Sequence, residues 1–249
     1  MTDHAGAGMS AVTLTKFSLL RRRGGCTHEA FVRHWRTVHV DVLVNQAGHK
    51  RYNRSYVQNE FLTLPGFDDQ RFDGAAQMVP QSPDVVQRGF QDDPLYQRYV
   101  RPDEQQFLDV AGCNVLYCES AAVDHVERAE APVKALVLVR GLPGTSRSAF
   151  VEAWTRRAQA LVAASDANGV LGMRQHWVMP GAARCMLDGS AWAEAPDAVD
   201  EMFFGSLDAL ARLCSSDAFT QGFGGALALA PGQGSHLFPA HAHLVYEGA

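Results

Sequence analysis

The 249-residue sequence has neither a strong charge excess nor a long apolar run. Its formal net charge is −5, from 22 Lys and Arg against 27 Asp and Glu, and its longest basic run is residues 21–23. Nucleic-acid binding leaves a basic stripe or patch. A membrane-spanning helix needs roughly 20 consecutive apolar residues, and no segment approaches that. We therefore expect neither nucleic acid nor membrane as a partner.

Cysteine is also scarce. There are five, at positions 26, 113, 118, 185 and 214, and none forms a CxxC pair. An odd, scattered set favours reduced thiols over disulfides or a zinc cage. The N-terminus shows no positively charged, apolar secretory signal. We expect a cytoplasmic protein in which residues 1–12 form a disordered leader.

Several catalytic motifs are missing. There is no GxGxxG after a strand, no P-loop, no GxSxG and no HExxH, which argues against nucleotide, phosphoryl and serine-hydrolase chemistry. The densest histidine cluster is His236, His241 and His243. Alternating His on a strand can bind a metal, but no carboxylate stands at ligand spacing. We predict no metal site and no cofactor.

What the sequence does have is a repeat. The segment "AFVRHWRTVHVDVL" at 30–43 returns as "AFVEAWTRRAQALV" at 149–162. Hydrophobic periodicity and turn residues predict, in the first half, strands at 16–22, 51–59, 73–80 and 113–119, a helix at 28–46 ended by Gly48, and a helical stretch from Ser82. In the second half they predict strands at 134–140, 172–180, 199–205 and 241–247, a helix capped by Thr145 or Ser146, and a helix at 206–219.

The order β-α-β-β-α-β therefore occurs twice, and this order is the ferredoxin-like motif. Its four-stranded antiparallel sheet carries both helices on one face and leaves the other face bare. Because the strands are apolar on both faces, the bare faces must be buried. We predict an α+β fold in which units 13–122 and 133–249, joined by the linker 123–132, pack their sheets into one pseudo-dimeric α/β barrel. Such a barrel can hold a small ligand inside.

The first half resembles the EthD family of dimeric α/β-barrel proteins. The resemblance rests on the strand ending "LLRR", the helix motif "FVRHWRTVHV", Gly48, and "FDGAAQM" at 72–78. The second half, more diverged, resembles the family through "AFVEAW" and "HLVYEG", so the chain reads as a tandem duplication. This family and its neighbours include lactone isomerases, polyketide cyclases and dehydratases, cofactor-free monooxygenases and members of no known activity. The resemblance implies a fold more firmly than a reaction.

His39 is the histidine that matches the family's helix motif, and its counterpart in the second half is Ala158. Phe31, Trp35, Val38 and Val42 form the stripe expected to pack on the sheet, with His39 at its edge. A histidine there can act as general acid or base near neutral pH, or can be structural. His34 is expected to face solvent.

Further candidates lie on the predicted strands. Tyr52, Arg54 and Tyr56 share one face of the second strand, where Tyr and Arg can hold an enolate or carboxylate oxygen. Asp73 either caps its turn, which we favour, or orients His39. The predicted site then consists of catalytic His39, Tyr56, Asp73 and His176 and of substrate-binding Trp35, Tyr52, Arg54 and Trp177.

We hypothesise a small-molecule enzyme, an isomerase, cyclase or dehydratase, that moves a proton next to the carbonyl of an apolar or aromatic compound such as a polyketide, lactone or ring-cleavage product. Two alternatives stay open: a cofactor-independent or haem-linked monooxygenase, and a non-catalytic ligand-binding barrel. The expected partner is a small-molecule substrate, and a homodimer of two such chains is left open.

Overall fold

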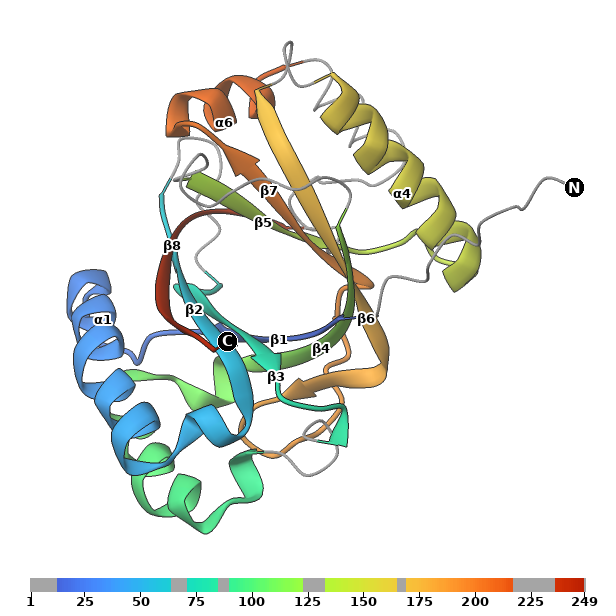
Figure 1. Cartoon of the computed structure of the whole chain (residues 1–249). Helices are drawn as coiled ribbons and strands as arrows, with labels where there is room; N and C mark the ends of the chain where they lie inside the picture. The colour runs from blue at the N-terminus through green and yellow to red at the C-terminus, as the bar shows by residue number, and fades with distance from the viewer. Residues whose placement is uncertain are drawn as a thin grey trace, which may run out of the picture.

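A computed structural model describes residues 13–63, 71–84, 90–122, 133–164, 169–216 and 236–248. Within them, eight antiparallel strands close into one barrel in the order β1-β3-β2-β8-β5-β7-β6-β4 (Figure 1). The strands are β1 Thr13–Leu20, β2 Asn53–Phe61, β3 Gly74–Pro80, β4 Asn114–Ala122, β5 Val133–Val139, β6 Val170–Cys185, β7 Ala198–Phe204 and β8 His236–Glu247. The predicted α+β barrel is confirmed. The leader 1–12 and the linker 123–132 lie outside the described residues.

Both units have the strand order of the ferredoxin-like motif, and they join edge to edge. Strand β2 of the first unit pairs with β8 of the second, with Gln58 opposite His243. Strand β4 pairs with β6, with Glu119 opposite Trp177. Strands β6 and β8 are longer than the predicted 172–180 and 241–247, because their extra residues complete ladders with β4 and β5. Local periodicity does not show such long-range pairings.

The helices cover the outside of the barrel, one group on each unit (Figure 1). In the first unit, α1 His28–His34 continues through π-helical turns at Trp35–His39 and Val42–Gln46, and Gly48 ends it with a φ of 66°. The short segments η4 Phe90–Asp92 and η5 Tyr96–Val100 precede α3 Arg101–Phe107. In the second unit lie α4 Arg147–Ala163 and α6 Leu207–Cys214. The described part of the chain contains no helix long and apolar enough to cross a membrane.

The π-helical turn at Trp35–His39 changes which residues face the sheet. Val38, predicted to pack on the sheet, is 47% exposed, whereas His39 is only 6% exposed. The i→i+5 hydrogen bonds of a π-turn widen the helix, so residues four apart rather than three keep the same face. Phe31, Trp35 and His39 therefore form the buried row. The expected place of Val38 was wrong for this reason.

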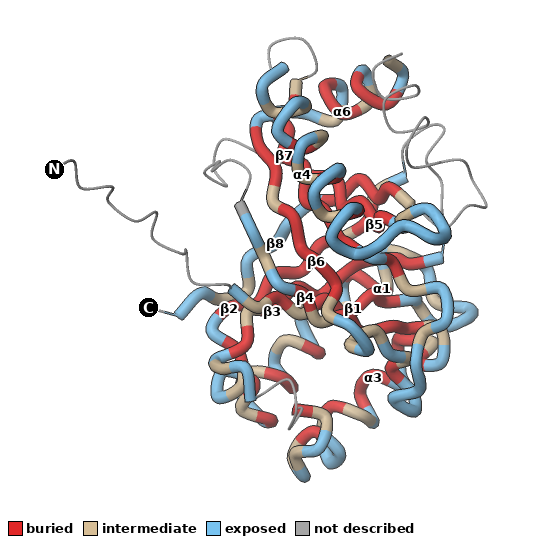
Figure 2. The backbone as a smooth tube through the Cα atoms, turned by 90° about the vertical axis from the view of Figure 1, so that its right-hand side faces the viewer, coloured by how far each residue is buried: buried red, intermediate tan, exposed pale blue. Residues whose placement is uncertain are grey.

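The interior of the barrel is packed with side chains, and Figure 2 shows the strands as largely buried. Its apolar part includes Phe17, Leu19, Leu136 and Phe238, each at most 2% exposed. A ligand chamber lined by these residues would leave their side chains accessible to a water-sized probe. Large apolar side chains from both units therefore meet at this level of the barrel, and no water-sized space lies against these four residues.

A polar network crosses the same interior between the units. The Lys134 ammonium lies 3.5 Å from the Glu201 carboxylate and 3.0 Å from the Gln77 side-chain oxygen, and Gln77 also donates to Glu201. His176 bonds Ser120 at 2.8 Å across the β4–β6 seam. Burial would raise the pKa of Glu201, but Lys134, His176 and Arg174 together outweigh it and hold that pKa well below its usual range. Glu201 is therefore an ionised buried group, and Lys134 is the largest of the influences that keep it so.

We expect Lys134→Met to lower the free energy of unfolding by about 3 kcal/mol, because it leaves a buried carboxylate without its cation. Urea denaturation at neutral pH measures the loss. Replacing both partners, Lys134→Met with Glu201→Leu, should recover most of it. Since the pKa of Glu201 is lowered by folding, its stabilisation is present above about pH 4.5 and is lost as the pH falls further. A single variant as stable as the wild type would contradict this account.

Candidate functional site

A small cleft lies between the first unit's helices and the outer face of its sheet. It has a volume of about 40 Å³ and is partly open to solvent. Apolar walls come from residues such as Leu43, Met78 and Phe90. The polar lining consists of Lys16, Ser18, Trp35, His39, His49, Tyr56, Gln91, Tyr96 and Glu104. The described residues thus bring a histidine, tyrosines and a carboxylate together outside the barrel.

His39 is held in one orientation by Asp103. Its Nδ1 lies 2.7 Å from Asp103 Oδ2, and His34 Nε2 lies 2.8 Å from Asp103 Oδ1. Burial would raise the pKa of Asp103, but the hydrogen bonds from His39 and His34 outweigh it and hold that pKa below its usual value. An ionised Asp103 accepts the Nδ1 proton, so Nε2 is the ring nitrogen of His39 that remains for the cleft. No described residue bonds Nε2, so this nitrogen can accept a proton or a hydrogen bond from a molecule in the cleft.

Tyr56 supplies a hydroxyl to the same cleft. Its oxygen accepts hydrogen bonds from Trp35 Nε1 at 2.9 Å and from Gln58 Nε2 at 3.1 Å. Burial raises the pKa of Tyr56 well above its ordinary value, so the group stays protonated. With both acceptor positions used, its own proton is available to an acceptor in the cleft. Tyr56 can therefore donate to a substrate oxygen.

The other polar residues of the cleft have partners within the protein. Tyr96 donates to both oxygens of Glu104 at 2.8 Å, and burial raises the pKa of Glu104. His49 pairs with the Tyr246 hydroxyl at 2.7 Å and with Asn53 at 3.0 Å. Burial, reinforced by the charges of Lys16 and His39, lowers the pKa of His49 to about 3. His49 is thus a neutral side chain in the wall of the cleft, and both of its ring nitrogens are hydrogen-bonded.

Three of the eight predicted site residues, Trp35, His39 and Tyr56, meet in this cleft. Tyr52 instead bonds Asp93 at the edge of the unit, and Arg54 is exposed. Tyr52 and Arg54 therefore lie outside the cleft that Tyr56 lines, and the β2–β3 ladder has a register shift between Asn53 and Ser55 that breaks the simple alternation.

Asp73 has the favoured turn role. It accepts from the Arg22 backbone at 2.7 Å, pairs with the Arg22 side chain, and lies 3.5 Å from His28. Asp103, and not Asp73, orients His39. The remaining two predicted residues lie in the second half: His176 inside the barrel, and Trp177 against Phe150 with ring centroids 5.9 Å apart. These positions do not join the cleft.

Sequence reasoning missed Asp103, Glu104 and Tyr96. They follow the segment 85–89, which lies outside the described residues, and precede β4. Asp103 stands 64 positions from His39, so no local spacing links them. The available signal was the acidic pair of "RPDEQQF", with Pro102 in the first turn of a helix. An acidic residue there more commonly serves the helix dipole.

Among the described residues, the two features that a bound metal ion or haem needs are a set of ligands and enough space. The described residues contain no group of three or more His, Cys, Asp or Glu placed to hold a metal ion, and His241 and His243 are exposed on β8. The cleft between the helices and the sheet of the first unit has a volume of about 40 Å³. This is far below the roughly 300–1,000 Å³ that is usual for ligand pockets. The equivalent space in the second unit is filled by an apolar cluster around Trp154 and Leu210. Neither of these two helix–sheet spaces has room for a haem.

Comparison with known proteins supports the architecture. The family model of the EthD domain matches residues 23–111, so the resemblance of the first half is confirmed. The unit boundaries 13–122 and 133–249 stay a prediction. No curated protein matches the chain.

Solved structures similar to the chain cover nearly all of it. An anthrone oxidase-like protein has a TM-score of 0.60 at 9% identity, with 95% of each chain covered. A proposed monooxygenase from Lactobacillus acidophilus NCFM has 0.51 at 8% identity, covering 96% of this chain and 98% of that one. Chlorite dismutase from Candidatus Nitrospira defluvii has 0.51 at 11% identity, covering 93% and 92%. At these identities the likeness establishes the fold alone.

We expect Asp103→Asn to remove the preference of His39 for the Nδ1-protonated tautomer, because an amide does not impose the carboxylate's acceptor-only character. The ¹⁵N shifts of labelled histidine at pH 8 report the tautomer. His34→Gln is the matched control, since it takes away the other imidazole on Asp103 and leaves the His39 bond. Unchanged His39 shifts in Asp103→Asn would contradict the arrangement.

Proposed function

We propose that the chain is an enzyme that removes a proton next to the carbonyl of an apolar or aromatic small molecule. The observation that carries this proposal is that His39 and Tyr56 line one cavity. His39 presents an unbonded Nε2 and Tyr56 presents an available hydroxyl proton. A base and an oxyanion donor are the two groups that enolate formation needs.

The step balances with these two side chains. His39 Nε2 takes the proton from the carbon beside the carbonyl, and the C–H electron pair forms the enolate double bond. The negative charge moves to the carbonyl oxygen, where Tyr56 donates a hydrogen bond. Asp103 stabilises the imidazolium through its bond to Nδ1 at 2.7 Å. Return of the proton to another carbon gives isomerisation, and loss of a leaving group gives dehydration.

The size and lining of the cleft favour an apolar substrate that enters only in part. About 40 Å³ admits a carbonyl and its neighbouring carbon, so the remaining atoms extend through the open side. Neutral His49 and the apolar Leu43, Met78 and Phe90 form uncharged parts of the walls, and Lys16 is the cation of the lining. Such a setting strengthens the hydrogen bond from Tyr56 to a developing oxyanion.

Oxidation by molecular oxygen is a second candidate. The enolate formed by His39 is electron-rich and can pass electrons to O₂, and an anthrone oxidase-like protein has the highest TM-score of the neighbours described above, 0.60. In that reaction anthrone and O₂ would give anthraquinone and water.

If the chain were a non-catalytic binding barrel, we would not expect a base and an oxyanion donor to lie in one cleft. The meeting of His39 and Tyr56 therefore supports an enzyme over a carrier. The partner that we propose for the chain is a small-molecule substrate.

We expect the wild type to accelerate deuterium exchange at the α-carbon of 2-tetralone in D₂O without oxygen, followed by proton NMR. His39→Gln should lose the acceleration, since it removes the base. Tyr56→Phe should slow the exchange about a hundredfold by removing the oxyanion donor. Circular dichroism would verify that both variants fold.

Arg54→Ala is the control and should exchange at the wild-type rate, because Arg54 is exposed outside the cleft. Oxygen uptake with anthrone, lost in His39→Gln, would select the oxidative branch. Exchange by His39→Gln at the wild-type rate would overturn the proposal.

A further inference from the structure

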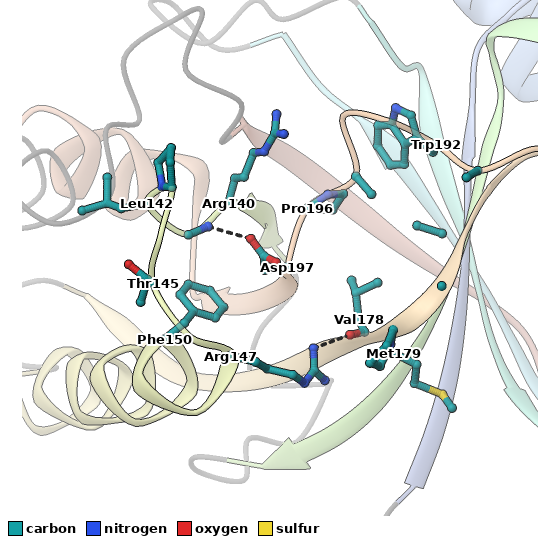
Figure 3. Close-up of a pocket in the computed structure, with 17 residues that line it drawn as sticks. Arg140, Leu142, Thr145, Arg147, Phe150, Val178, Met179, Trp192, Pro196 and Asp197 are labelled. Carbon is teal, nitrogen blue, oxygen red and sulfur yellow. Dashed lines mark hydrogen bonds between the residues drawn. The ribbon is translucent and has the colours of Figure 1, made fainter.

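A second and much larger cavity lies on the second unit. Its volume is about 550 Å³, within the usual range for small-molecule sites. The turn after β5, the start of α4, the middle of β6 and the segment before β7 form its walls (Figure 3). It shares no residue with the cleft around His39. It is therefore a separate site and does not depend on the proposed function.

The position of this cavity in the second unit can be compared with the equivalent position in the first unit. Asp73 and Asp197 each precede the third strand of their unit, and their backbone N–H groups bond Leu20 and Val139 at 2.7 and 2.8 Å. Each carboxylate accepts from a backbone N–H just after the first strand, from Arg22 at 2.7 Å and from Gly141 at 2.8 Å. The two aspartates are thus structural counterparts.

The side chains around these aspartates differ. In the first unit, Arg22 and His28 pair with Asp73. In the second unit, Gly141 has no side chain at the place of Arg22. Arg147 is the first helical residue, as His28 is, and it donates to the Val178 carbonyl at 2.7 Å instead of to the aspartate. The loss of these partners leaves open a space that ion pairs occupy in the first unit.

The lining indicates what this space would bind. Its charged residues are Arg140, Arg147 and Asp197. Arg147 uses one N–H on Val178 and, as a guanidinium, has five in all. Phe150 on α4 and Trp192 on the segment before β7 supply aromatic walls (Figure 3). We propose that the cavity binds a small aromatic carboxylate, with its carboxylate on Arg147 and its ring against Phe150 and Trp192.

The probe is 2-naphthoate, followed by isothermal titration calorimetry on the full chain. Arg147→Ala should weaken binding about tenfold or more, the effect of losing a charge-assisted hydrogen bond. Gly141→Arg should abolish binding by restoring the side chain that the first unit has at this place. A Cβ at Gly141 would lie 3.2 Å from Phe150 and 3.4 Å from Asp197, so only small shifts are needed. Thermal unfolding would verify the fold of each variant.

His39→Gln is the control for independence and should bind 2-naphthoate as the wild type does. Protonated 2-naphthylmethylamine keeps the ring and reverses the charge, and should bind more weakly. The proposal is overturned by tighter binding of the amine, by wild-type affinity in both Arg147→Ala and Gly141→Arg, or by no binding of 2-naphthoate to the wild type.

Discussion

Main-chain pairing along two seams holds the two units together. Strand β2 pairs with β8 and β4 with β6, so each unit's sheet gives both of its edges to the other. Closure leaves no strand edge free, and it brings large side chains from both sheets into one interior. Large apolar side chains fill part of that interior. The cleft around His39 lies between the helices and the outer face of the sheet, and the larger cavity lies where loops of the second unit meet β6.

The two units keep one scaffold and differ in what covers it. Trp35 and Trp154 stand at the same helix position, and each donates from its indole to the sheet, to Tyr56 at 2.9 Å and to Asp200 at 2.6 Å. Burial raises the pKa of Asp200 to about 8, so it is mainly protonated at neutral pH within an apolar cluster. His39, by contrast, has Ala158 as its counterpart. The first unit therefore keeps a polar cleft where the second has a solid core.

The sequence allowed the fold to be predicted well, because repeated elements and strands apolar on both faces leave few alternatives to a closed barrel. It predicted His39 and Tyr56 through a helix motif and strand alternation. It did not predict Asp103, which only the tertiary structure brings to His39, nor the exposure of Val38, which depends on a π-turn. The second cavity lies where Gly141 stands in place of Arg22 and where Arg147 bonds Val178 instead of Asp197, and both differences come from comparing the two units in three dimensions.

The pairing of β2 with β8 also sets an order of events during synthesis. β8 comprises the 12 residues His236–Glu247 and provides the partner of β2 in the first unit. A ribosome releases β2 long before β8, so one edge of β2 stays unpaired in the nascent chain until β8 has been synthesised. Unpaired edges favour association with other chains. A chain shortened by its last strand would therefore be prone to aggregate even though every residue of the His39 cleft is present.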